Sequence, residues 1–215
     1  MVRVVVVDDE PMVCAHLRTI LGSASDVQVV AEAHDGAAGV EAVLRDRPDV
    51  VLMDLRMPGM DGLTAIERIG ELASPPAVVV LTTFDADRYV LRALRAGAAG
   101  FLVKSTPPDD LISLVRVAAE GHTVLSPAAA RRLIAASSDS QPARDRARQL
   151  TGSLTDRERE VLACLGEGMS NAQIAARLYL SEATVKGYVS RMLDKLGCAN
   201  RTQAGLLAHD AGLTP

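Results

Sequence analysis

The sequence predicts an α/β domain built on a doubly wound, five-stranded parallel sheet, followed by a smaller all-α domain of four helices. Short Val-rich runs alternate with stretches of helical spacing five times over the first 126 residues. This alternation favours a parallel sheet with helices on both faces. From residue 154 onward, residues that cap helix starts recur before stretches of helical spacing, and the sequence shows no strand-like run. This pattern predicts the second, helical domain.

The five strands are expected where apolar runs are continuous, which is typical of parallel strands buried on both faces. These runs cover residues 4–7, 27–31, 50–53, 78–81 and 100–103. Apolar residues recur at helical spacing between the runs, and they predict helices over about 11–22, 36–46, 61–71, 86–96 and 108–121.

The expected domain limits follow from changes in composition. Residues 1–122 contain the five βα repeats, and residues 151–215 contain the helical pattern. Between them, residues 123–150 are expected to form a linker. Its first part, 126–137, has the composition of a helix, and the rest is rich in Ser, Asp, Arg, Pro and Gln, as exposed linkers are.

Capping residues mark the four helices of the second domain. Thr155 and Glu158 have the spacing of a capping box, in which each side chain accepts a hydrogen bond from the other residue's backbone. The remaining helices are expected over 171–178, 182–196 and 201–211, after the capping residues Ser170, Ser181 and Asn200.

The composition is that of an ordinary folded protein. Hydrophobic residues make up 48% of the 215 residues and charged residues 23%, which excludes wholesale disorder. The three cysteines are far apart, which indicates a reducing compartment and argues against disulfides or structural zinc. No run of about 18 apolar residues occurs, so we expect no membrane partner and a cytoplasmic location.

Charge is distributed unevenly along the chain. Residues 1–126 contain 11 basic and 18 acidic residues, residues 127–150 contain 5 and 2, and residues 151–215 contain 7 of each. The acidic first domain is therefore a poor partner for nucleic acid. Nucleic-acid binding by the second domain requires its basic residues to lie on one face.

Three carboxylates are expected at one edge of the sheet. Asp8 and Asp9 follow the first apolar run, and Asp54 follows the third. In the strand order 2-1-3-4-5, the first and third strands flank the point where ligands bind, beyond their carboxyl ends. Converging carboxylates repel one another and need a cation, and their hard oxygen ligands suit Mg²⁺. One of them could then act as a nucleophile towards a phosphoryl group.

Two further strand ends carry residues that phosphoryl transfer requires. Thr82, after the fourth run, supplies a hydroxyl, and Lys104, after the fifth, supplies a fixed positive charge. Other chemistries fit worse. The first run is not followed by G-x-G-x-x-G, no P-loop motif occurs, and Arg56 stands where an aspartate-nucleophile phosphatase would have an acid.

Residues 3–121 resemble the receiver domain of response regulators. The resemblance rests on the three acids, on Thr82 and Lys104, and on the stretch from Asp54 to Gly62. The resemblance implies a flavodoxin-like fold, Asp54 as phosphoacceptor and a histidine kinase as partner. It also implies Mg²⁺ held by the carboxylates and the Arg56 carbonyl, phosphoryl contacts by Thr82 and Lys104, and Phe101 as the switch residue. Many relatives have Tyr instead of Phe101.

Residues 154–211 resemble the LuxR-type helix-turn-helix. The matching positions include Leu154-Thr-Asp-Arg-Glu158, Glu160-Val-Leu162, Gly168, Ser170-Asn171, Ile174-Ala175, Leu178, Ser181, Thr184-Val-Lys186, Leu193, Lys195-Leu196 and Arg201. A receiver followed by this module is the NarL/FixJ-type architecture, which implies a transcription regulator, not an enzyme, that binds double-stranded DNA as a dimer.

The helix expected over 182–196 is the candidate recognition helix. Its apolar stripe faces the core and its polar residues face outward; the stripe comprises Val185, Val189, Met192 and Leu196. The base-facing candidates are Lys186, Gly187, Tyr188 and Ser190, and the phosphate-facing candidates are Thr184, Arg191 and Lys195. Many relatives have His at Tyr188 and a larger residue at Gly187. Arg201 is expected to pair with Glu158 or Glu160.

The leading hypothesis is a switch in which phosphorylation of Asp54 draws Thr82 and Lys104 inward and Phe101 follows. This change alters the face around helix 86–96, strand 100–103 and helix 108–121. The altered face then favours dimerisation or releases the helical module. Two alternatives remain: a receiver-like domain that acts without phosphorylation, and a phosphatase that uses the acidic pocket. The dimer surface also remains open between helices 11–22 and 108–121, the face ending at the fifth strand, and helix 200–211.

Overall fold

The computed structural model describes residues 1–82, 90–125 and 147–214. The chain divides into two compact units, residues 1–132 and 133–215, and each is described by itself. The expected helix over 126–137 lies outside the described residues, as does the first part of the helix expected over 86–96.

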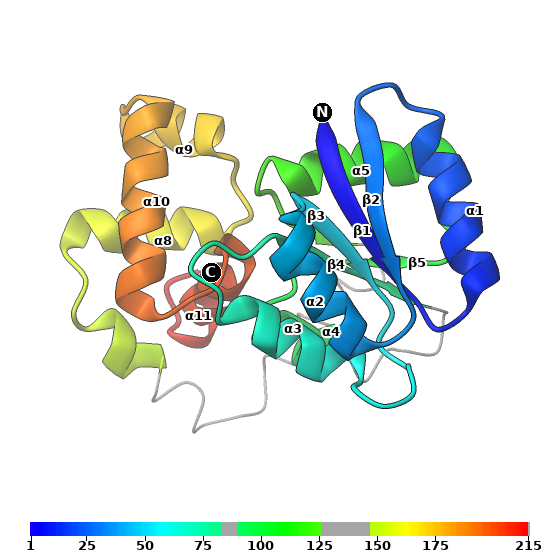
Figure 1. The fold of residues 1–215 in the computed structure, drawn as a ribbon. Helices are drawn as coiled ribbons and strands as arrows, with labels where there is room; N and C mark the ends of the chain where they lie inside the picture. The colour runs from blue at the N-terminus through cyan, green and yellow to red at the C-terminus, as the bar shows by residue number, and fades with distance from the viewer. Residues whose placement is uncertain (83–89, 126–146, 215) are drawn as a thin grey trace. The chain divides into compact units, whose positions relative to one another are not determined.

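The first unit is built on a parallel sheet with the order β2-β1-β3-β4-β5-β6 (Figure 1). The first five strands confirm the predicted number, direction and order. Their bounds are β1 Val2–Val7, β2 Val27–Ala33, β3 Val50–Met53, β4 Ala77–Thr82 and β5 Gly100–Val103. Their Val-rich segments are buried, as expected for strands covered on both faces.

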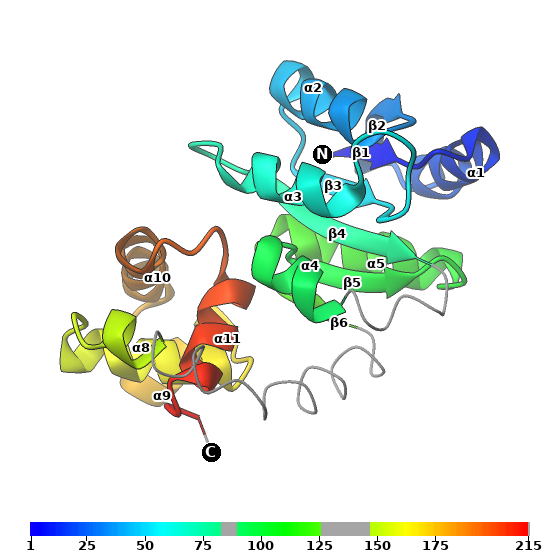
Figure 2. The ribbon, with the colours of Figure 1, turned by 90° about the horizontal axis from the view of Figure 1, so that it is seen from below.

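A sixth strand, β6 (Val124–Leu125), extends the sheet into the range expected to be linker. It pairs in parallel with Gly100 and Phe101 of β5, and Figure 2 shows β4, β5 and β6 side by side. The absence of a side chain at Gly100 permits this approach, since a Cβ there would lie 2.5 Å from the Val124 carbonyl oxygen. Two residues are too few to produce a recognisable alternating pattern, so sequence analysis missed this strand.

Helices cover both faces of the sheet. Helices α1 (Pro11–Gly22) and α5 (Pro108–Ala119) contact each other on one face and bury Leu17, Leu21 and Val115 against the strands. On the other face, α2 (Gly36–Asp46) contacts α3 (Gly62–Gly70), and α3 contacts α4 (Val90–Ala96). The doubly wound arrangement places the carboxyl ends of β1 and β3 next to each other at one edge.

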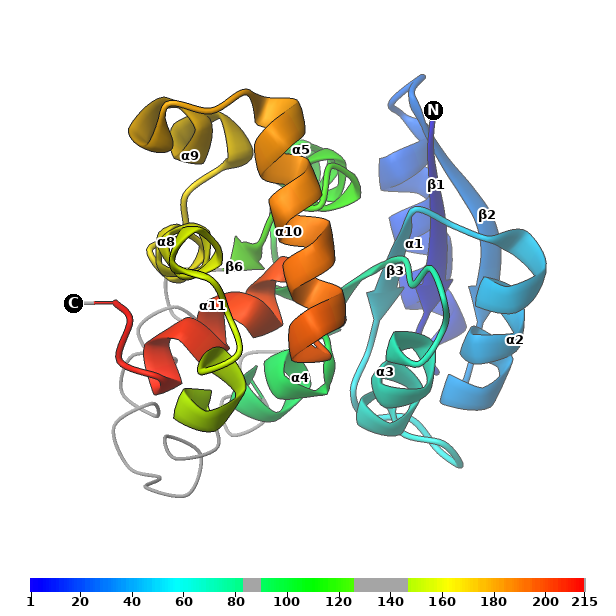
Figure 3. The same cartoon turned by 90° about the vertical axis from the view of Figure 1, so that its left-hand side faces the viewer.

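From residue 154 onward, the described part of the second unit has four helices that share one apolar core. Figure 3 shows these helices. They are α8 (Asp156–Gly166), α9 (Asn171–Leu178), α10 (Glu182–Leu196) and α11 (Arg201–Asp210). Residues 147–150, expected at the end of the linker, are helical as well, and this helix continues to Thr151. Helix α8 packs against α11, and α9 against α10.

The predicted capping residues hold the helix starts. The Glu158 carboxylate accepts the Thr155 backbone N–H at 2.8 Å, and the Thr155 hydroxyl accepts that of Glu158, which completes the capping box of α8. Ser170 forms a second capping box with Gln173 at the start of α9. Ser181 and Asn200 cap α10 and α11 as predicted. In the described ranges, no helix has the length and hydropathy needed to cross a membrane.

Candidate functional site

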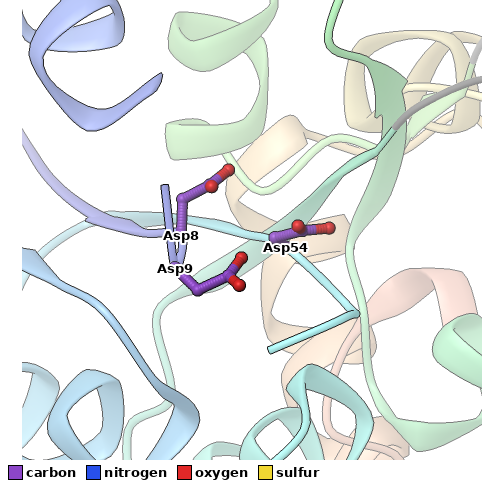
Figure 4. Close-up of side chains that lie close together, drawn as sticks. All are labelled: Asp8, Asp9 and Asp54. Atoms are coloured by element: carbon purple, nitrogen blue, oxygen red, sulfur yellow. The ribbon is translucent and has the colours of Figure 1, made fainter. Parts of the chain in front are cut away.

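Three carboxylates meet at the carboxyl ends of β1 and β3 (Figure 4). One oxygen each from Asp8, Asp9 and Asp54 lies within 4.8 Å of the others. Asp8 is 1% exposed and Asp54 is 8% exposed, whereas Asp9 is exposed to solvent. Like charges this close, two of them largely removed from water, favour binding of a cation. The structure therefore brings together the three acids that the sequence places at strand ends.

Backbone contacts fix the orientation of Asp54. Its Oδ1 accepts the Leu55 N–H at 2.7 Å, and its own N–H donates to the Val7 carbonyl at 2.9 Å. The chain then turns tightly back into α3. A Cβ at Gly62 would lie 2.1 Å from the Asp54 carbonyl oxygen, so only glycine fits this approach. The loop from Asp54 to Gly62 therefore holds the carboxylate rigidly on its strand end.

The start of α3 adds a further fixed charge to this loop. The Asp61 carboxylate caps α3 by accepting the Thr64 backbone N–H at 2.8 Å. This hydrogen bond lowers the pKa of Asp61 from its ordinary value. Asp61 is therefore a charged, structural acid near the cluster, and its capping role accounts for its presence.

Lys104 supplies the positive charge at the cluster. Its Nζ lies 2.7 Å from Asp8 Oδ2, 3.1 Å from Asp54 Oδ2 and 3.9 Å from Glu10 Oε1. Burial works to lower the pKa of Lys104, but hydrogen bonds and charge attraction from Asp8 and Asp54 outweigh it and raise the pKa. The ammonium is therefore held in its charged form between the two buried carboxylates.

Thr82 and Phe101 lie on β4 and β5, the two strands that follow β3 in the sheet. Thr82 ends β4 and is 2% exposed, and its backbone carbonyl accepts the Lys104 N–H at 2.7 Å. Phe101 is 4% exposed within β5, where it pairs with Val80 of β4. The aromatic ring is thus already part of the interior in this structure.

A hollow of about 320 Å³ adjoins the cluster. It is lined by Asp9, Leu55, Arg56, Met57, Pro58, Asp61 and Leu63. Arg56, whose carbonyl was predicted as a metal ligand, lies on this loop with its side chain exposed. The hollow gives a small phosphorylated group space beside the exposed acid Asp9.

Sequence analysis missed three residues that support Asp8. Glu10 donates its backbone N–H to Asp8 Oδ1 at 3.1 Å. On the other side, His34 Nδ1 lies 3.1 Å from the Asp8 carbonyl oxygen, and the Cys14 thiol donates to the same oxygen at 3.5 Å. Burial raises the pKa of Cys14 to about 11, so this cysteine is a packed, protonated thiol. Only Glu10, which directly follows the two acids, had a signal in the sequence.

Helix α10 has the two faces predicted for a recognition helix. Val185, Met192 and Leu196 are buried, and Val189 packs against the same core. The exposed predicted contacts are Thr184, Lys186, Ser190, Arg191 and Lys195. A Cβ at Gly187 would meet only the Arg191 guanidinium, at 3.8 Å, so packing within the domain does not require glycine there.

Two predicted DNA contacts have partners inside the domain. Lys195 Nζ lies 3.0 Å from Glu158 Oε2, so its charge contributes to the α8 capping box. Tyr188 is half-buried against the helical core, with the Arg191 guanidinium carbon 5.1 Å from its ring centre. Both residues therefore have structural roles that the sequence pattern did not reveal.

The predicted pairing of Arg201 with an acid is wrong. Its guanidinium donates to the Met169 carbonyl and to Asn171 Oδ1, the latter at 3.4 Å. Glu158 pairs with Lys195 instead, and Glu160 pairs with Arg157 at 2.6 Å. Arg201 thus fastens α11 to the start of α9 through neutral acceptors, which sequence spacing could not distinguish from the acids.

Comparisons with known proteins cover both units. Residues 4–116 match the response regulator receiver domain, and residues 152–208 match the luxR family of bacterial regulatory proteins. The chain is 36% identical to the uncharacterized transcriptional regulatory protein YxjL of Bacillus subtilis, over 99% of this chain and 97% of that protein. It is 34% identical to the nitrate/nitrite response regulator protein NarL of Escherichia coli strain K12, over 96% and 94%. The solved structure of the response regulator ChrA from a heme-sensing two-component system is similar over 99% of this chain and 98% of that one, with 39% identity and a TM-score of 0.54.

Proposed function

We propose that this chain, which belongs to the NarL/FixJ-type response regulators, changes its binding to DNA when a histidine kinase phosphorylates Asp54. The family consists of transcription regulators that join a receiver to a LuxR-type DNA-binding domain. The observation that carries the proposal is the meeting of Asp8, Asp9 and Asp54 with the Lys104 ammonium at the strand ends.

The carboxylate cluster fits a Mg²⁺ ion. Its three carboxylates offer hard oxygen ligands within 4.8 Å of one another, and Asp9 is open to solvent, which suits an ion that retains several waters. We propose Asp8, Asp9, Asp54 and the Arg56 backbone carbonyl as its holders. When bound, the ion neutralises negative charge on the transferring phosphoryl group.

Asp54 is the proposed nucleophile. One of its carboxylate oxygens forms a bond to phosphorus as the bond between phosphorus and the kinase's histidine nitrogen breaks, and the released imidazole takes up a proton. The Leu55 N–H holds Oδ1 during this step, so the carboxylate enters the reaction in a fixed orientation. The product is an aspartyl phosphate.

Lys104 and Thr82 are the proposed contacts to the new phosphoryl group. Lys104 already lies 3.1 Å from Asp54 Oδ2, so a small displacement brings its ammonium to a phosphoryl oxygen. Thr82 ends the strand next to that of Asp54 and can supply its hydroxyl. Phe101, buried on β5, is the proposed residue that repacks in response and carries the change to the surface around α4, β5 and α5.

Helix α10 is the proposed DNA-reading element. Lys186, Gly187 and Ser190 are proposed to face base edges, and Thr184 and Arg191 to contact phosphates. Tyr188 contributes mainly by packing beneath Arg191. We assign Lys195 to its ion pair with Glu158, not to a phosphate.

Two copies are proposed to bind adjacent half-sites as a homodimer, since one small module contacts few base pairs. The proposed domain limits are residues 1–122 for the receiver, 123–150 for the linker and 151–215 for the DNA-binding domain, with β6 at the start of the linker range belonging to the receiver sheet. Because a transcription regulator acts at the chromosome, we propose a cytoplasmic location in the bacterial cell.

Acetyl phosphate with Mg²⁺ tests the proposal directly. Wild type, Asp54→Asn and the surface control Asp110→Asn are treated alike, and their phosphorylation is measured by intact-protein mass spectrometry. We expect a phosphoryl adduct and tighter DNA binding in the wild type and in Asp110→Asn, and neither effect in Asp54→Asn. Equal modification and equal DNA affinity in all three proteins would contradict the proposal.

A further inference from the structure

Tyr179 combines two features that the folded domain does not explain. It ends α9 with φ 56° and ψ 47°, in the left-handed region that side chains rarely adopt. Its side chain is also 96% exposed. The residue stands two positions before Ser181, the N-cap of α10.

The left-handed conformation is imposed by the turn. The Ala175 carbonyl accepts the N–H groups of Tyr179 and Leu180, the latter at 2.9 Å, which closes the end of α9. The Arg157 guanidinium also donates to the Leu178 carbonyl, at 2.5 Å. Glycine is the residue that adopts such a conformation most readily at a helix end. The turn therefore requires the conformation but disfavours a tyrosine.

Packing does not account for the tyrosine either. The next residue, Leu180, packs against the helical core, whereas the Tyr179 ring is in solvent. A residue that is unfavourable for the backbone and contributes little burial is explained most simply by a contact outside the domain.

The position in the fold indicates the partner. The turn before α10 lies at the end of this helix that enters the major groove in helix-turn-helix proteins. Hydroxyl groups of tyrosine are common donors to DNA phosphates, which fix the register of the protein on the duplex. Thr184 and Lys186, on the first turns of α10, are exposed as well.

We propose that the Tyr179 hydroxyl donates a hydrogen bond to a DNA phosphate beside the bases that α10 reads. The inference rests on the DNA contact by α10 proposed above. It assigns Tyr179 to the DNA interface as an affinity-determining residue, at a position where glycine would suit the fold better.

The test uses the full-length protein phosphorylated with acetyl phosphate. The probe is a duplex selected from a random-sequence library by the wild-type protein. Wild type, Tyr179→Gly, Tyr179→Phe and Lys186→Ala are compared by thermal unfolding and by DNA titration at several salt concentrations. Lys186→Ala tests the α10 contact independently of Tyr179.

We expect Tyr179→Gly to melt at the same temperature as the wild type or higher, yet to bind DNA about five- to tenfold more weakly. Tyr179→Phe should show most of the same loss, because the hydroxyl is the proposed donor. Neither change should alter the slope of affinity against salt, because the hydroxyl carries no charge. Lys186→Ala should weaken binding to the selected duplex more than binding to an unrelated duplex, because Lys186 is proposed to face base edges.

Wild-type affinity in both Tyr179 variants, with a loss in Lys186→Ala, would overturn the inference and leave the proposed function intact. Wild-type affinity in all three variants would instead overturn the α10 contact and the inference with it. If Tyr179→Gly destabilises the domain, Tyr179→Phe decides, since it leaves the backbone preference nearly unchanged. Tighter binding by unphosphorylated Tyr179→Gly would also overturn the inference and indicate a contact with another part of the chain.

Discussion

At the scale of single residues, Lys104 is the counter-charge of two buried acids in the first domain. Two buried carboxylates lie within 3.1 Å of its ammonium, and each would otherwise be a largely desolvated negative charge. A buried acid that loses its partner destabilises the folded state. Lys104 therefore stabilises the unmodified protein, and it is also the residue proposed to contact the phosphoryl group.

Replacing Lys104 with Met should lower the free energy of unfolding by about 1 to 3 kcal/mol, since it leaves charged groups without a partner. Added Mg²⁺ should restore more stability to this variant than to the wild type, because the ion replaces the missing positive charge. Urea denaturation at pH 7, with and without Mg²⁺, measures both effects.

The comparison of Lys104→Met with the wild type must be made at a pH where Lys104 is charged. Because the folded pKa of Lys104 is raised above its ordinary value of 10.5, its contribution is fully present below that pH and is lost only as the pH rises through the folded value. Arg68→Met, at an exposed helix position, is the control and should show neither effect. If Mg²⁺ raises the stability of both variants equally, Mg²⁺ does not act at the carboxylates that Lys104 contacts.

Residue identities at the site were largely predictable, but several partners were not. Asp8, Asp54 and Lys104 could be predicted because each directly follows an apolar run, and parallel strands end at one edge of a sheet. By contrast, the acceptors of Arg201 are a backbone carbonyl and an amide oxygen. Such partners are set by how α9 and α11 pack, and sequence spacing carries no information on them.

At the scale of elements, the connection from β3 to α3 decides the geometry of the site. Gly62 lets the start of α3 approach the Asp54 carbonyl oxygen more closely than any other residue would allow. Its N–H also donates to the Leu55 carbonyl at 3.1 Å. The helix thereby holds the phosphoacceptor loop against its strand.

Gly62→Ala should destabilise the protein by about 1 to 3 kcal/mol, as expected for overpacking, and should slow modification of Asp54 by acetyl phosphate. The matched control is Gly22→Ala at the end of α1, where an added Cβ meets nothing within 4 Å. Urea denaturation compares the stability of the two variants, and the time course of modification by acetyl phosphate compares their reaction rates. Wild-type stability and a wild-type rate of modification in Gly62→Ala would show that the loop accommodates the added methyl group without loss of stability.

The capping box of α8 links two helices of the second domain. Glu158 accepts from Thr155 at the helix start, and its carboxylate also pairs with Lys195 of α10. The hydrogen bond from the Thr155 backbone, followed by that from Lys195, lowers the pKa of Glu158. One carboxylate therefore stabilises both the start of α8 and the end of the candidate recognition helix.

Glu158→Gln should lower the melting temperature at pH 7, because glutamine retains the cap but loses the ion pair. A group with a lowered folded pKa contributes stability above its unfolded value, here 4.5, and loses it as the pH falls through the folded value. The difference between variant and wild type should therefore shrink below pH 4.5. Circular dichroism melts at pH 7 and pH 3.5 measure it, and a difference that persists undiminished at pH 3.5 would refute the assignment.

At the scale of the whole molecule, the two units have separate cores. One core is formed by the sheet with α1 and α5, and the other by α8 to α11. Each unit therefore has its own stabilising contacts. This arrangement suits a regulator whose input and output reside in different domains.

Beryllofluoride, which mimics the phosphoryl group, should increase self-association of the full-length protein in the presence of Mg²⁺. Sedimentation velocity over a range of concentrations measures this, with Asp54→Asn as the negative control and Glu41→Gln, at an exposed position of α2, as the surface control. If Asp54→Asn dimerises to the same extent as the wild type, self-association does not depend on Asp54.

The sequence by itself determined the features that depend on local pattern: five parallel strands, the capped helices, and the acids and lysine at strand ends. These were predictable because strand burial, helix capping and strand direction follow from neighbouring residues. The tertiary structure decided what depends on packing between distant segments. It added β6 against Gly100, placed Glu158 beside Lys195, and left Tyr179 exposed in a left-handed turn, because each depends on how segments apart in the sequence pack together.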